Sequence, residues 1–202
     1  MGTMNFSKGG FTGSVGIHTG RSWKGIQVLA TKAKPAYSRT EEQGTIRDAF
    51  GRFNRFTALF APEIKYLTSL NTSKQSVRNA ITQLNKDHIR EPDYPFENLQ
   101  INAGGRQKPI APAATSTGGI VTVTWTKPTS TVYSDQAKMI ILVVDEDDAM
   151  VEVGQVAPTA ETWTGTINMG TNTDVYVYCW LLDKVGSMRV GSKSVGIKIA
   201  KS

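Results

Sequence analysis

Apolar side chains between residues 40 and 88 recur every three to four positions, which is the spacing of amphipathic helices. Thr40 and Gln43 form a capping-box pattern, in which each side chain bonds the other's backbone N–H. The apolar stripe that follows consists of Ile46, Ala49, Phe50, Phe53, Thr57 and Phe60, and Pro62 interrupts it. A second helix is predicted after the capping pattern of residues 72–75 and ends near His88, with an inner stripe of Val77, Ala80, Ile81 and Leu84.

From Ile120 onward the pattern changes to short strands separated by polar turns. Residues 120–126 alternate, with Val121, Val123 and Trp125 on one face, and residues 139–144 are apolar without interruption, as in a strand covered on both faces or central in a sandwich. Further strands are predicted at 151–156, 162–169, 175–183 and 195–200. Six or seven short strands at this spacing favour an immunoglobulin or fibronectin-III-like sandwich. We expect its core to contain Trp125 and the aromatic set Tyr176, Tyr178 and Trp180.

The first 31 residues have a different character, with seven glycines in residues 1–25. Residues 14–18 and 22–31 predict a glycine-rich hairpin. Its apolar content is sparse, and unpaired strand edges accept other chains. We therefore expect this segment to dock on a neighbouring subunit, with Gly10, Gly13, Gly16 and Trp23 as candidate contacts.

Residues 104–119 are rich in Gly, Pro, Ala and Thr, which is typical of a linker. The predicted fold class is therefore α+β in two domains. Residues 1–103 form a basic domain of the hairpin and two helices, and residues 120–202 form an all-β sandwich. Because its strands and aromatic residues are self-contained, we expect residues 110–202 to fold alone.

Charge separates the same two halves. Residues 1–105 hold 14 Lys or Arg against 8 Asp or Glu, so they carry the whole net charge of +6, whereas residues 106–202 hold nine of each. Arg47, Arg52 and Arg55 are predicted on the outer face of the first helix, near Arg39. Two interpretations stay open for this face: a solvated surface, or a binding face for acidic protein or for nucleic acid.

The residues that carry chemistry are few. One cysteine, Cys179, excludes an intrachain disulfide, and its apolar strand indicates a core residue. His18 and His88 give no basis for a metal site or a catalytic triad. The run 145–148 has four acidic residues but lacks the calcium-loop pattern, so a solvated hairpin tip is the favoured interpretation. We expect no enzyme activity, no cofactor, no metal and no membrane association, and the N-terminus shows no secretory h-region.

A set of short motifs in this chain resembles an uncharacterised protein family of Bacteroidota and their phages. The motifs are the glycine-rich 10–16 segment, Trp23-Lys24-Gly25, Thr40-x-x-Gln43 with Arg47 and Phe50, and the later Trp125 and 183–186 turn. The resemblance covers most of the chain. It implies a virion role and assigns no catalytic residue, because the family has no established chemistry.

The sequence therefore predicts a non-enzymatic structural component of a phage virion, associated with the capsid or tail. It would act through protein partners, either copies of itself or virion neighbours, and would be made in the bacterial cytoplasm. The alternatives are a bacterial binding or adhesion module and a DNA-associated basic protein. The candidate contact residues are Gly10, Gly13, Gly16, Trp23, Arg39, Arg47, Arg52 and Arg55.

Overall fold

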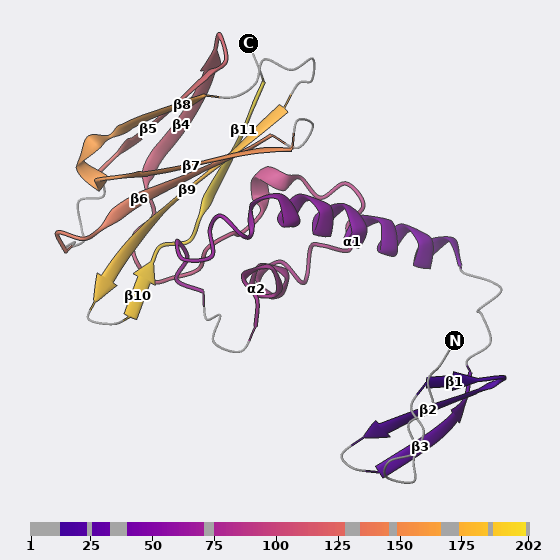
Figure 1. The fold of residues 1–202 in the computed structure, drawn as a ribbon. Coiled ribbons are helices and arrows are strands. Elements are labelled where there is room, and N and C mark those ends of the chain that lie inside the picture. The colour runs from indigo at the N-terminus through magenta and orange to yellow at the C-terminus, as the bar shows by residue number, and fades with distance from the viewer. Residues whose placement is uncertain are drawn as a thin grey trace. The chain divides into compact units, whose positions relative to one another are not determined.

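The structure is a computed structural model that describes residues 13–23, 26–32, 40–70, 75–127, 134–145, 149–166, 174–185 and 188–200 (Figure 1). The chain divides into two compact units, Met1–Thr40 and Glu41–Ser202. Each unit is described by itself below.

The first unit contains a three-stranded antiparallel sheet in the order β1–β2–β3, formed by β1 (Gly13–Val15), β2 (His18–Trp23) and β3 (Ile26–Thr31). A turn at residues 16 and 17 separates β1 from β2, and Gly16 adopts a φ of 57° there. Glycine tolerates this left-handed conformation without a steric penalty. The prediction had placed one strand over residues 14–18, so it missed this turn and one of the three strands.

The second unit contains the predicted β-sandwich. One sheet has the order β4–β5–β8 and consists of β4 (Ile110–Thr117), β5 (Ile120–Thr126) and β8 (Thr162–Thr166). The other, which we call the central sheet, has β9 paired with β6, β10 and β11, and β7 paired with β6. Its strands are β6 (Lys138–Asp145), β7 (Met150–Val156), β9 (Asp174–Val185), β10 (Met188–Gly191) and β11 (Val195–Ala200). The short 3₁₀ turn η2 (Pro158–Ala160) leads from β7 to β8.

Aliphatic side chains fill the space between the two sheets. Trp125 is 4% exposed and packs there with Val121, Val123 and the odd-numbered residues of β6 and β9, so its predicted core position is confirmed. The indole Nε1–H of Trp125 donates to the carbonyl oxygen of Pro158, 3.1 Å away, which satisfies its one polar group. Cys179 is fully buried in the same core.

The opposite face of the central sheet is covered by helices. The helical cover consists of α1 (Glu41–Phe60), α2 (Val77–Leu84) and the 3₁₀ turn η1 (Phe96–Asn98), together with their connections. Phe53, Phe56 and Phe60 of α1 share one core with the even-numbered residues of β6 and β9. Figure 1 shows α1 and α2 on the side of this sheet that faces away from β5 and β8. The central sheet is therefore buried on both faces, as the unbroken apolar run 139–144 predicted.

The observed division of the chain corrects the predicted one. Residues 41–103 are not part of an N-terminal domain, because their apolar face is buried against the sandwich. The predicted linker 104–119 contains β4, which pairs with β5. Tyr176, Tyr178 and Trp180 also face the helical cover and not the sandwich core, where Val175, Val177, Cys179 and Leu181 lie instead.

The helix starts were predicted with mixed success. Helix α1 begins at Glu41, directly after Thr40. Helix α2 begins at Val77 and is capped by Ser76, whose hydroxyl accepts the backbone N–H of Asn79 at 3.2 Å. The predicted cap for α2 at residues 72–75 lies four residues too early, and its first three residues fall outside the described part of the chain.

Candidate functional site

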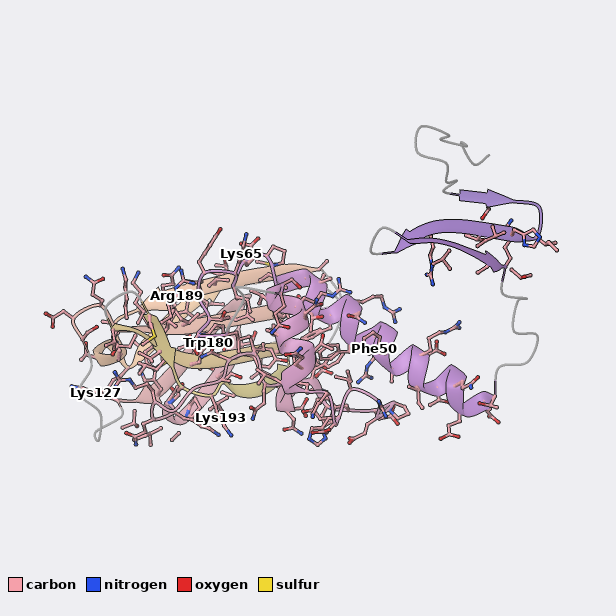
Figure 2. The ribbon with its side chains drawn as sticks, turned by 90° about the horizontal axis from the view of Figure 1, so that it is seen from below. Phe50, Lys65, Lys127, Trp180, Arg189 and Lys193 are labelled. Atoms are coloured by element: carbon pink, nitrogen blue, oxygen red, sulfur yellow. The ribbon has the colours of Figure 1, made fainter. Side chains whose placement is uncertain are left out.

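Helix α1 buries only part of its predicted apolar stripe. Phe53 and Phe60 are at most 2% exposed, whereas Ile46 and Phe50 remain 38% and 42% exposed. Phe50 lies about 60° around the helix axis from Phe53, at the edge of the buried arc. Figure 2 shows Phe50 on the part of α1 that extends away from the strands. The predicted inner face is therefore confirmed at Ala49, Phe53, Thr57 and Phe60 and wrong at Ile46 and Phe50.

These exposed side chains line a shallow groove, which we call the α1 groove. Its volume is about 460 Å³, and it lies between α1 and the turn after α2. Its apolar lining consists of Ile46, Phe50 and Ile89, which is 8% exposed. Its remaining lining residues are Gln43, Arg47, Lys86 and Arg90. The groove therefore combines an apolar centre with three cationic side chains.

Asn85 holds the turn that carries Lys86, Ile89 and Arg90. Its buried side chain donates from Nδ2 to the carbonyl oxygens of Ile81 at 2.8 Å and Gln100 at 2.9 Å. Its Oδ1 accepts the backbone N–H of Gln100 at 2.9 Å. A buried amide with all these groups bonded fixes the turn relative to the end of α2 and to residue 100.

The three arginines predicted on one outer face have three different environments. Arg47 is exposed and reaches Asp48 at 3.8 Å, a surface pair that contributes about 0–1 kcal/mol. Arg52 is half-buried. Its guanidinium donates to the carbonyl oxygen of Tyr94 at 2.6 Å and lies 4.6 Å from the ring centre of Phe96. Arg55 is exposed. Only Arg47 belongs to the α1 groove, and Arg52 has a structural role within the helical cover.

The other predicted contact residues belong to the first unit or to undescribed segments. Gly13 pairs with Gly20 between β1 and β2, Gly16 forms the turn, and Trp23 ends β2. Gly10 and Arg39 lie outside the described residues. The predicted contact role of these residues stays a prediction.

Sequence reasoning missed Lys86, Ile89 and Arg90 as functional candidates. The available signal was an isolated apolar residue within a charged segment that follows the end of α2. Helical periodicity does not extend into this turn, so the pattern could not assign Ile89 to any face.

The structure describes the surroundings of Cys179, His88 and Asp145, which the sequence offered as candidates for catalysis or metal binding. Burial raises the pKa of the Cys179 thiol to about 12, so the thiol stays protonated at neutral pH. The ring of His88 is exposed, stacks on Tyr94 with centres 5.3 Å apart and has Nδ1 3.2 Å from the Glu91 carboxylate. Within the described segments, no three His, Cys, Asp or Glu side chains gather as a metal would require. Asp145 is buried at the end of β6, and residues 146–148 fall outside those segments.

Comparisons with protein-family models and with curated proteins give no match. Among solved structures, the chain is similar to the fn3 domain of human collagen alpha-1(XX) chain, with 16% identity and a TM-score of 0.36. It is also similar to the fibronectin type-III domain of human fibronectin type III domain containing protein 3, with 12% identity and a TM-score of 0.28. Each match covers 48% of this chain, and 87% and 92% of the two domains respectively. In the described part of the chain, neither helix has the length and apolarity needed to span a bilayer.

Proposed function

We propose that this chain is a non-enzymatic assembly module that docks a neighbouring protein subunit in the α1 groove. The observation that carries the proposal is the exposure of Ile46 and Phe50 beside Ile89, with cations around them. Interfaces of this kind combine an apolar anchor with charged groups at the rim. An apolar side chain flanked by carboxylates is the complementary partner.

The scaffold supports this use of the groove. Phe53, Phe56 and Phe60 anchor the C-terminal half of α1 in the core, so the exposed half extends from a fixed base. The opposite wall is held by the bonds of Asn85. A partner would therefore meet a surface that needs little ordering on binding, which favours affinity.

Self-association of the full chain at low salt tests the proposal. We expect a concentration-dependent oligomer in sedimentation velocity, and Phe50→Ser should weaken it by about tenfold or more, as for an interface anchor. Met188→Ser is the matched control, because Met188 is 68% exposed and lies on β10 outside the groove. A chain that stays monomeric throughout, or a Phe50→Ser variant that associates like the wild type, contradicts the proposal.

The partner's chemistry can be separated by salt. Arg47→Gln should weaken association with an acidic protein surface modestly, most clearly at low ionic strength where screening is weakest. DNA binding would instead fall steeply with salt, because every neutralised phosphate releases counterion. The commitment of Arg52 to Tyr94 and Phe96 removes one cation from the predicted DNA-binding face, which favours the protein partner.

A second assembly contact is proposed for the glycine-rich segment 2–31. Deleting residues 1–31 should leave Glu41–Ser202 folded, because that unit has its own core. It should also reduce the size of the oligomer. A deletion variant that sediments in the same oligomeric state as the full chain would remove this segment from the proposal.

The finer proposal is that the module is a capsid- or tail-associated part of a phage virion. It rests on the sequence resemblance described above. A binding or adhesion module is the alternative that a β-sandwich equally suits, since one fold serves many functions. Mass spectrometry of purified phage particles tests the virion role: absence of this chain from particles whose genome encodes it would overturn it.

A further inference from the structure

A second candidate site lies at the end of the central sheet, where strand register places several cations on one face. Side chains that share a face with Trp180 and Ile140 point toward the helical cover. Lys184 is four residues beyond Trp180, and Lys138 is two residues before Ile140, so both point to that side. Arg189 pairs directly with Lys184 between β10 and β9, which puts it on the same face.

As far as the described residues show, the helical cover stops before it reaches these cations. Trp180 donates from Nε1 to the carbonyl oxygen of Leu67 at 2.8 Å. This bond fixes the segment that follows α1 over the sheet. Beyond Leu67, the described part of the chain leaves a hollow of about 190 Å³ on the sheet face, which we call the Tyr66 recess. Leu67 and Leu182 line it, together with Gln136, Gln155, Lys138, Lys184 and Arg189.

The exposed ring of Tyr66 holds two cations at the rim of this recess. Tyr66 is 65% exposed. Lys65 Nζ lies 5.2 Å and the Arg189 guanidinium carbon 5.7 Å from the centre of its ring. Figure 2 shows Lys65 and Arg189 toward the same edge of the second unit, away from Lys193. A tyrosine ring attracts such cations and keeps their charges close together.

Asp183 is among the residues that line the recess, but its carboxylate does not neutralise these cations. Asp183 is 2% exposed and alternates with Leu182 and Lys184, so it belongs to the opposite face. It accepts the Ser134 hydroxyl, the Lys184 backbone N–H at 2.8 Å and Arg106 Nη2 at 3.3 Å. Among the described residues, Lys65, Lys138, Lys184 and Arg189 form no ion pair within 4.0 Å.

We propose that the Tyr66 recess binds an acidic side chain of an extended protein segment. Its volume is below the roughly 300–1,000 Å³ of pockets that enclose whole small molecules, so it suits one group of a larger ligand. A carboxylate would pair with the cations that line the recess, which are Lys138, Lys184 and Arg189. The aliphatic part of a glutamate would pack against Leu67 and Leu182. Lys138 Nζ donates to the Gln155 side-chain oxygen at 3.2 Å, which holds this ammonium at the recess, and the Gln136 amide supplies a further hydrogen-bonding group. This site is separate from the α1 groove, and neither proposal depends on the other.

The test uses a fluorescent poly-glutamate peptide as probe and the full chain as receptor. The variant Lys184→Gln/Arg189→Gln removes two recess cations. The matched control Lys127→Gln/Lys193→Gln removes two exposed positive charges that do not line the recess. Both variants have the same net charge, so a general electrostatic effect would change them equally. Phe50→Ser keeps the recess intact and separates this site from the α1 groove.

We expect the recess variant to weaken peptide binding by about five- to thirtyfold at low salt, as for the loss of two exposed charge pairs. The control variant and Phe50→Ser should change it less than about twofold, and Tyr66→Leu should weaken it because Arg189 loses its support. Equal loss in the recess and control variants, or no loss in either, overturns the proposal. The proposal is also overturned if single-stranded DNA or heparin binds at the recess and poly-glutamate does not.

Discussion

The two faces of the central sheet are buried by different kinds of contact. The face toward β4, β5 and β8 is mostly aliphatic, and the facing sheet contributes the buried Trp125 and the half-buried Trp163 to it. The face toward the helical cover meets aromatic rings and carries hydrogen bonds as well. The hydroxyl of Tyr178 donates to the carbonyl oxygen of Phe96 at 2.6 Å, and Trp180 donates to that of Leu67 at 2.8 Å. Apolar burial on the first face does not depend on orientation. The hydrogen bonds on the second face do, so they also fix the position of the helical cover.

Aromatic geometry adds to this directional character. Phe56 stacks on Phe96 with ring centres 4.1 Å apart and planes 18° apart, and it meets Tyr176 edge-on at 5.3 Å. Such pairs contribute about 0.5–1.5 kcal/mol beyond the area that they bury. At Gly196 a Cβ would collide with the carbonyl oxygen of Glu97, so glycine lets η1 lie directly against β11. The cover is therefore an integral layer of this unit.

Removing the helical cover is the strongest test of this difference between the two faces of the central sheet. A fragment of residues 104–202 would expose five side chains that are now fully buried: Ile140, Leu142, Val144, Tyr178 and Trp180. A contiguous apolar patch of this size favours aggregation. We expect the fragment to aggregate or to lack a cooperative thermal transition, as measured by circular dichroism and by dye binding. A soluble fragment that melts cooperatively would restore the sequence-based prediction that the sandwich folds alone.

The aliphatic face is tested by Trp125→Ala. We expect this change to lower the free energy of unfolding by about 3–5 kcal/mol, because it removes a large buried side chain and leaves a cavity. Urea unfolding measures the loss against a total of about 5–15 kcal/mol for ordinary domains. Trp163→Phe, at a half-buried position on β8, is a milder control. A midpoint unchanged by Trp125→Ala would contradict the core position.

Asp183 adds a charged contact at the end of the aliphatic face. Burial alone would raise its pKa, but the hydrogen bonds from Ser134 and Lys184 and the charge of Arg106 together hold that pKa below its ordinary value. We expect Asp183→Asn to reduce stability by about 1.5–3 kcal/mol at neutral pH, as for a hydrogen bond to a charged group.

The pH dependence of that loss follows from the direction of the shift. A lowered pKa in the folded state means that the unfolded state binds the proton more readily, so this stabilisation is complete above the unfolded value of about 3.9. It decreases as the pH falls below that value and through the lower pKa of the folded state. Urea unfolding of both proteins across this range should show their stabilities converging in acid. A difference that stays constant would contradict the charged state assigned to Asp183.

The smallest expected effect concerns the directional bonds of the aromatic face. Tyr178→Phe keeps the ring and removes the hydroxyl that donates to Phe96, so we expect a loss of about 1 kcal/mol. Tyr66→Phe is the control, because Tyr66 is largely exposed, and it should change stability by less than about 0.5 kcal/mol. Equal effects from both changes would mean that the buried hydroxyl adds nothing to the position of the cover.

Strand patterns predicted the central sheet better than its partners. The unbroken run 139–144 correctly indicated burial on both faces of β6. Alternation along β9 separated Tyr178 and Trp180 from Val177 and Cys179, but it could not tell which set faces a sheet and which faces helices. Strand β4 was missed because Pro112 and its Ala and Thr neighbours are typical of a linker. The sequence nevertheless carries a local signal for it, because Gly118 and Gly119, with φ of 58° and 78°, form the two-residue turn that joins β4 to β5 as a hairpin. The prediction assigned both glycines to the linker.

The candidate site was predicted only in part. Helical spacing placed Arg47 on α1, but it also placed Ile46 and Phe50 on a buried face that the structure leaves partly open. Periodicity gives the direction of a side chain and not the extent of the layer beneath it. Lys86, Ile89 and Arg90 join the α1 groove through a turn held by Asn85, and such turns have no repeating pattern.

The reactivity of the single cysteine reports how often the sandwich opens. Cys179 lies on β9 between Ile141 of β6 and Val195 of β11, and it is fully shielded from solvent. Its side chain points into the core between the two sheets, so a thiol reagent can reach the sulfur only when the sandwich opens, and the high pKa makes the closed form unreactive as well. The labelling rate of the native chain therefore measures how often the sandwich opens, with no engineered cysteine and no second cysteine to confuse the signal.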